Sequence, residues 1–286
     1  SCKYPKSILS TPISEAGLVG LASGHALLGG QAFAEIMFGD FVTYAFDQIV
    51  NGISKYHHMY GKNISCPVTI RMPMGGKRGY GPTHSQSLEK FLCGIDNLLV
   101  VALNSIEDPF KTLQEASEQD CPKIIIENKV DYGRRAYNTP HPNLEITKAQ
   151  TSLGEVYISP KYNQCHFSII TYGENARVIL DNYEDIAEKT NSIFDVFCLI
   201  KLNPLDLAEI AKSISKVKKV LIVDDGSTNY GISAEIIANL FENGFRGDFK
   251  RIGAEPVPIP SPKNLENESL VNVRSIMTTI LELLDE

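Results

Sequence analysis

Residues 71–87 read RMPMGGKRGYGPTHSQS, directly after the apolar run Val68-Thr69-Ile70. The run predicts a buried strand, and the glycines and prolines after it predict a loop at the end of that strand. A glycine-rich loop lets the backbone approach a ligand closely. His84 and Gln86 place an imidazole and an amide just beyond the glycines. Because open α/β sheets bind ligands beyond the carboxyl ends of their strands, this stretch predicts a functional site on such a sheet.

A second candidate site is the acid Glu15, within the segment TPISEAG at residues 11–17. The small residues that follow it, up to Gly30, predict a helix that can pack closely against another backbone. The sequence leaves open whether that contact crosses a subunit interface or belongs to an ordinary internal helix. Together, the two candidate sites indicate an enzyme half-site rather than a plain scaffold.

The composition limits the compartment and the partners. Hydrophobic residues make up 43% and charged residues 21% of the 286 residues, as in globular proteins, and the net charge is −7. An acidic chain without a strongly basic stretch is not expected to bind nucleic acid. Its apolar runs are far too short to cross a bilayer, so no membrane association is expected. Six cysteines without a Cys-x-x-Cys pair indicate reduced thiols. We therefore expect a bacterial cytoplasm or an organelle matrix, mitochondrial or plastid.

Two successive series of β-branched runs alternate with helical patterns, which predicts two doubly wound α/β domains with parallel sheets covered on both faces. We place the first domain at residues 1–135, a polar linker at 136–150 and the second domain at 151–286. The predicted strands are residues 32–38, 68–71, 98–103, 123–126, 166–171, 194–200, 219–223 and 249–252. The predicted helices are residues 17–30, 41–60, 87–93, 109–118, 174–189, 204–215, 233–242 and 273–284. The string Asp224-Asp225-Gly226 has the composition of a turn, and we interpret its acids, with Glu255, as turn and surface groups.

Four motifs of the first domain, TPISEAG, AEIMFGDF, AFDQIVN and HSQS, follow one another in this order. They resemble the beta subunit of the thiamine diphosphate-dependent decarboxylase that pyruvate, branched-chain 2-oxo acid and acetoin dehydrogenases share. The strings NPLD at 203–206 and RIGA at 251–254 resemble the second domain of the same family. The resemblance implies a transketolase-like pyrimidine-binding domain followed by a transketolase carboxyl-terminal domain. Only ten residues precede Thr11, fewer than in the family, so we expect the first strand region to be missing and the sheet to have an exposed edge.

The resemblance also implies roles for residues of the first domain. Glu15 corresponds to a sheltered carboxyl that hydrogen-bonds the aminopyrimidine ring of thiamine diphosphate and favours the tautomer that takes the thiazolium proton. Met37 and Phe41 correspond to residues that line the aminopyrimidine pocket. His84 corresponds to an active-site histidine that steadies the substrate or assists transfer to the lipoyl group. Without the resemblance, Glu15 would be read as a surface acid, Met37 and Phe41 as core residues, and His84 as a solvent-exposed residue.

The resemblance further implies that this chain works with partners. The cofactor's pyrophosphate and magnesium are held in this family by a Gly-Asp-Gly motif, which the sequence lacks. We therefore expect no metal ligands in this chain and an alpha-type decarboxylase subunit that binds the magnesium and the pyrophosphate. The expected assembly has two alpha and two beta chains, so it includes a second copy of this chain, and it docks on a lipoyl acyltransferase core.

The function that the resemblance favours is oxidative decarboxylation of a 2-oxo acid, with pyruvate as the expected substrate, and acylation of a lipoyl group. Two alternatives stay open, another transketolase-type carboligase and a non-catalytic assembly subunit. Thr83 and Lys201-Leu202 depart from the residues usual in the family at these positions. These departures bear on activity more than on the fold.

Overall fold

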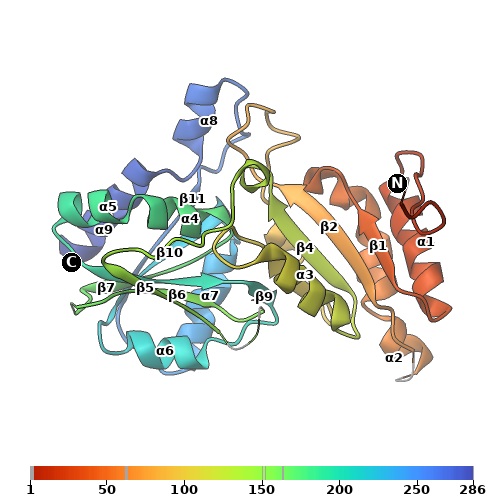
Figure 1. The fold of residues 1–286 in the computed structure, drawn as a ribbon, viewed down its shortest axis with the longest axis horizontal. Coiled ribbons are helices and arrows are strands. Elements are labelled where there is room, and N and C mark those ends of the chain that lie inside the picture. Colours follow the sequence, from red (N-terminus) through yellow and green to blue (C-terminus); the bar gives the residue numbers. More distant parts are fainter. Residues whose placement is uncertain (1–2, 62–63, 150, 152, 163, 286) are drawn as a thin grey trace.

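The computed structural model describes residues 3–61, 64–149, 151, 153–162 and 164–285. Their strands form two sheets that lie side by side along the long axis of the molecule (Figure 1). The strand order is β1-β2-β4-β3-β9 in the first sheet and β11-β10-β7-β8-β6-β5 in the second. The predicted pair of α/β units is confirmed, but each sheet is mixed rather than entirely parallel.

Four parallel strands and one antiparallel edge strand, β9, form the first sheet. Strands β2 and β4 are buried along nearly their whole length, as expected for strands covered on both faces. Strand β1 forms the opposite edge, where Phe33 is 54% exposed. The unpredicted strand β9 follows directly on the second sheet's β8 and so ties the two sheets together. The strands are β1 (Ala32–Glu35), β2 (Val68–Met74), β3 (Leu99–Ala102), β4 (Lys123–Asn128) and β9 (Lys201–Asn203).

The segment predicted as one helix over residues 41–60 is helical but changes its pitch. A 3₁₀ helix passes into a π-helix, and a short α-helix follows. The tight first turn suits the three-residue spacing of the buried Val42 and Ala45, and the wider turns suit the four-residue spacing of Ala45, Ile49 and Ile53. The helices of this unit are α1 (Glu15–Leu27), η1 (Gly39–Ala45), η2 (Gln48–Ile53), α2 (Tyr56–Tyr60), η3 (Glu89–Phe91), α3 (Pro109–Glu118) and η4 (Asp131–Gly133).

The second sheet also joins four parallel strands to an antiparallel part, the β5–β6 pair at one edge. This pair was not predicted, because β5 buries only Leu144 and follows a proline-containing polar stretch. Strand β10 continues through Asp224-Asp225-Gly226, so our interpretation of that string as a turn is wrong. The strands are β5 (Leu144–Lys148), β6 (Val156–Pro160), β7 (Phe167–Tyr172), β8 (Phe194–Leu199), β10 (Lys219–Ser227) and β11 (Asp248–Ala254).

The helix predicted over residues 174–189 is divided at Asn182. The side-chain amide of Asn182 donates to the Val178 carbonyl at 2.8 Å, and this local bond competes with the regular helix pattern. Helix α8 was not predicted, because its sequence KNLENES is almost entirely polar. The helices of this unit are α4 (Glu174–Asp181), α5 (Tyr183–Thr190), α6 (Ala208–Ile214), α7 (Ile232–Glu242), α8 (Lys263–Ser269) and α9 (Val273–Asp285).

One buried apolar cluster extends from the first sheet into the second. It contains Ile70 and Met72 of β2 together with Ile170 of β7 and Ile222 of β10. The two units therefore share a core, and their relative placement is fixed by packing. In the part of the chain that the structure describes, no helix is both long enough and apolar enough to cross a membrane.

Candidate functional site

The loop that follows β2 brings its imidazole against a group of aromatic rings. The His84 ring lies 4.7 Å from the Phe38 ring and 5.2 Å from the Phe41 ring, edge to face with each. Phe38 also meets Tyr80 edge to face at 6.1 Å. We call Phe38, Phe41, Tyr80 and His84 the aromatic cluster. Because Phe38 and Phe41 come just after β1 and the other two come after β2, the cluster lies at the carboxyl ends of adjacent parallel strands.

Two buried charges support the aromatic cluster. Asp40 is 6% exposed and accepts hydrogen bonds from the Gln86 backbone N–H at 3.1 Å and from its side-chain amide at 2.9 Å. Lys129 is 7% exposed, and its Nζ lies 3.0 Å from the centre of the Phe38 ring. Burial lowers the pKa of Lys129, and the nearby Asp40 carboxylate opposes that shift. We missed both residues in the sequence, although each follows a predicted strand at its carboxyl end.

The other predicted site residues lie on neighbouring elements. Glu15 is the first residue of α1, is half-buried, and follows Ser14, whose hydroxyl accepts from the Gly17 N–H at 3.3 Å. Helix α1 packs against η1, the helix that contains Phe41. Met37 is 70% exposed, which excludes the alternative that it is a core residue. His84 is partly buried among rings rather than fully exposed.

Comparison of the chain with known proteins shows the family to which it belongs. Residues 2–134 match the transketolase pyrimidine-binding domain, and residues 157–276 match the transketolase C-terminal domain. The chain is 30% identical to the pyruvate dehydrogenase E1 component subunit beta-1, mitochondrial, of Arabidopsis thaliana, over 96% of this chain and 76% of that protein. It is also 30% identical to the acetoin:2,6-dichlorophenolindophenol oxidoreductase subunit beta of Bacillus subtilis, over 98% of this chain and 80% of that protein. The chain belongs to the transketolase-like family of dehydrogenase beta subunits.

A further relative and a solved structure are also similar to this chain. The mitochondrial pyruvate dehydrogenase E1 component subunit beta of Saccharomyces cerevisiae is 28% identical over 98% of this chain and 76% of its own length. A solved structure described as split-gene transketolase, inactive beta4 tetramer, has a TM-score of 0.72. That match covers 99% of this chain and 86% of the solved chain at 16% identity, so it bears on the fold alone.

The two units of this beta-subunit chain meet at a cluster of buried acids. Glu89, in η3, is 3% exposed, and its Oε1 accepts from the Tyr172 hydroxyl at 2.7 Å. The same hydroxyl lies 3.4 Å from Oδ1 of Asp224, which is 1% exposed, so our interpretation of Asp224 as a surface acid is wrong. A tyrosine hydroxyl has one hydrogen and cannot donate to both acids. Burial raises the pKa of Glu89 to about 7 and that of Asp224 to about 6, so Glu89 takes up a proton as the pH falls through 7.

We expect Glu89→Gln to stabilise the chain at alkaline pH but not at acidic pH. The folded pKa of Glu89, about 7, exceeds the ordinary value of 4.5, so its favourable contribution is complete below about pH 4 and is lost as the pH rises through 7. The shift from 4.5 to about 7 corresponds to about 3 kcal/mol. Urea denaturation at pH 5 and pH 8 measures the difference, with Glu188→Gln, at an exposed position, as the control. An equal effect of Glu89→Gln at both pH values would show that Glu89 does not titrate as described.

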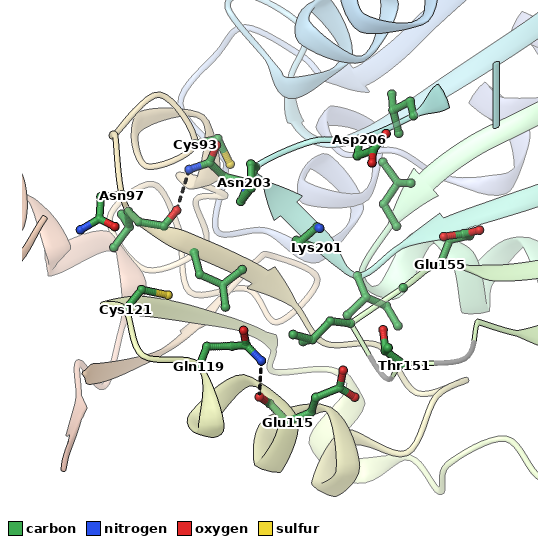
Figure 2. Close-up of a pocket in the computed structure, with 18 of the residues that line it drawn as sticks. Cys93, Asn97, Glu115, Gln119, Cys121, Thr151, Glu155, Lys201, Asn203 and Asp206 are labelled. Carbon is green, nitrogen blue, oxygen red and sulfur yellow. Dashed lines mark hydrogen bonds between the residues drawn. The ribbon is translucent and has the colours of Figure 1, made fainter. Parts of the chain in front are cut away.

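A large cavity lies away from the aromatic cluster. It has a volume of about 910 Å³ and opens between the two units beside β9 (Figure 2). Asn203 donates there to the Leu98 carbonyl at 2.6 Å, and Lys201 and Asp206 also line the cavity. Because Leu98 and Cys121 precede β3 and β4, the cavity lies at the amino-terminal ends of these strands, whereas the aromatic cluster follows the carboxyl ends of β1 and β2. None of the four predicted site residues lines it.

The described residues were compared with the requirements of a metal site built from His, Cys, Asp or Glu side chains. Across residues 3–61, 64–149, 151, 153–162 and 164–285, no group of three or more His, Cys, Asp or Glu side chains is placed to hold a metal ion.

Proposed function

We propose that this chain is the beta subunit of a thiamine diphosphate-dependent 2-oxo acid dehydrogenase E1 heteromer and supplies the pyrimidine side of its active site. The observation that carries the proposal is the aromatic cluster with His84, held at the carboxyl edge of the pyrimidine-binding unit. Similarity to pyruvate and acetoin beta subunits over nearly the whole chain supports it. We propose pyruvate as the substrate, because the yeast and Arabidopsis relatives carry that name.

The residues fit one face of a flat heterocycle. Phe41 is partly buried and presents a ring for stacking, and the exposed thioether of Met37 is free to close over an adjacent edge. Glu15, at the start of α1, would share its proton with a ring nitrogen of the aminopyrimidine. His84 would donate a hydrogen bond to the substrate or the acyl acceptor, because its ring is oriented by Phe38 and Phe41. When bound, the cofactor supplies the carbon nucleophile for decarboxylation.

The site needs a partner to complete it. We propose that an alpha-type subunit binds the magnesium and the pyrophosphate in an assembly of two alpha and two beta chains. Helix α1 supports this, because a Cβ added to Gly20 or Gly24 would meet no neighbouring atom, and Leu28 beside them is 89% exposed. This open face suits contact with another subunit rather than internal packing. The lipoyl acyltransferase core remains a proposed partner of the same assembly.

Reconstitution tests the proposed function. The chain is co-expressed with the alpha-type subunit of its source, and decarboxylation of pyruvate and of branched-chain 2-oxo acids is followed with an artificial electron acceptor. We expect turnover that requires both subunits, thiamine diphosphate and magnesium, with pyruvate the preferred acid. The chain without the alpha-type subunit is the control. A stable assembly without turnover on any acid would instead support the non-catalytic subunit.

A further inference from the structure

The glycine-rich loop that carries His84 is held by the second unit of the chain on both sides of the histidine. Before His84, the backbone of Arg78 and Gly79 contacts Glu266 of α8. After it, the Ser87 hydroxyl donates to Asp225 of β10 at 2.7 Å. Figure 1 shows the loop, drawn in orange after β2, beside α8. The loop therefore depends on contacts with residues more than a hundred positions away in the sequence.

Glu266 makes the most specific of these contacts. Its side chain is 0% exposed, yet the residue belongs to a short polar helix. Oε2 accepts from the Gly79 N–H at 2.8 Å, and Oε1 accepts from the Arg78 N–H at 3.3 Å. Burying a carboxylate is costly unless hydrogen bonds satisfy it, and here backbone donors of the loop do so.

The loop backbone needs such a contact, because it adopts conformations that are unfavourable for most residues. Gly79 has φ +73°, and Lys77, which has a side chain, has φ 68°. A Cβ on Gly79 would lie 3.2 Å from the Ser261 carbonyl oxygen, so the segment before α8 also approaches the loop closely. Strained backbone persists only where surrounding contacts determine it, and the Glu266 carboxylate supplies two of them.

We propose that Glu266 is a positioning residue, which fixes the glycine-rich loop and through it the place of His84 in the aromatic cluster. His84 follows Gly79 by five residues, and its N–H donates to the Gly81 carbonyl at 3.3 Å, so a displaced loop displaces the imidazole. A misplaced catalytic group lowers the rate without loss of the fold. This inference rests on the proposed function for its effect on turnover, but the hold on the loop is independent of it.

The test compares Glu266→Gln and Glu266→Ala with Glu268→Gln, a matched control at an exposed position of the same helix. Hydrogen exchange of the Arg78 and Gly79 amides is measured in the full chain assembled with its alpha-type subunit. We expect exchange to be about tenfold faster in Glu266→Gln and faster still in Glu266→Ala, because the amide retains one acceptor oxygen and alanine none. The thermal midpoint of Glu266→Gln should stay within about 2 °C of that of the control.

The kinetic part of the test uses the same variants. We expect kcat per assembled site to fall in the order control, Glu266→Gln, Glu266→Ala, with a smaller change in the KM of the 2-oxo acid. Unchanged protection of both amides in Glu266→Gln and Glu266→Ala would overturn the proposal, as would faster exchange with kcat equal to that of the control. If Glu266→Ala does not fold, the amide exchange and kcat of Glu266→Gln alone decide whether Glu266 positions the loop. If the wild-type assembly has no turnover, the proposed function fails, and amide exchange alone decides whether Glu266 holds the loop.

Discussion

We expect Glu15→Ala to lower the kcat of the reconstituted assembly by about 10²- to 10⁴-fold, the usual range for loss of a proton-transfer group. The carboxyl begins α1, in a helix that packs against the segment containing Phe41. No other acid lies between Thr11 and Gly30, so the helix offers no substitute. The measurement is steady-state decarboxylation of pyruvate, with the assembly checked by size-exclusion chromatography.

The fold should tolerate this change. Glu15 is only half-buried, and its favourable interaction with the amino terminus of α1 is worth less than about 1 kcal/mol. Glu15→Gln keeps the shape of the side chain but cannot release a proton, so it should lose activity nearly as strongly as Glu15→Ala. Glu118→Ala, at the exposed end of α3, is the control. Turnover by Glu15→Ala within threefold of this control would exclude the catalytic role and favour the assembly-subunit alternative.

The parts of the fold that the sequence predicted are those with strong local signals. Strands β2, β3 and β4 each contain a short apolar run, and α3 begins with a proline behind an aspartate cap, so each element was found. The predictions ended three residues before the end of β2 and two residues before the end of β4, where the strands continue through polar residues or proline. The missed elements lack such signals. Strand β9 is three residues long and pairs with the distant β3. The buried residues of α8, Glu266 and Ser269, are both polar, and Glu266 faces a distant loop.

The residues of the candidate site likewise fall into those that the sequence predicted and those that it did not. Glu15, Met37, Phe41 and His84 came from motif resemblance, and the structure places the last two in contact, while their chemical roles stay predictions. The buried charges were missed because an aspartate or lysine in a sequence is usually exposed. Asp224 illustrates the error, since Asp-Asp-Gly is typical of turns. Its burial depends on the Ser233 N–H at 3.2 Å, a partner that no local pattern reveals.

Lys123 is the buried charge whose removal should affect stability most. It is 0% exposed in β4, the strand between β2 and β3, where it pairs with Thr69 and Leu99. Its Nζ donates to the Gln119 carbonyl at 2.5 Å and to the Ser117 carbonyl at 3.3 Å, at the carboxyl-terminal end of α3. These carbonyls have no partner within the helix, and a positive charge is favourable there. Burial lowers the pKa of Lys123, and the neighbouring Cys121 and Asp120 oppose that shift.

We expect Lys123→Ala to lower the free energy of unfolding by about 3–5 kcal/mol, because it leaves both a cavity and two carbonyls without their donor. Lys123→Met keeps most of the volume and removes only the donor, so its cost should be about 1–3 kcal/mol. The free energies of unfolding of both variants are measured by chemical denaturation, with circular dichroism as the signal. Lys111→Ala, at an exposed position of α3, is the control. If Lys123→Ala stays within about 1 kcal/mol of that control, water replaces the ammonium at little cost. If Lys123→Met is as stable as wild type, packing of the stem rather than the charge joins α3 to the sheet.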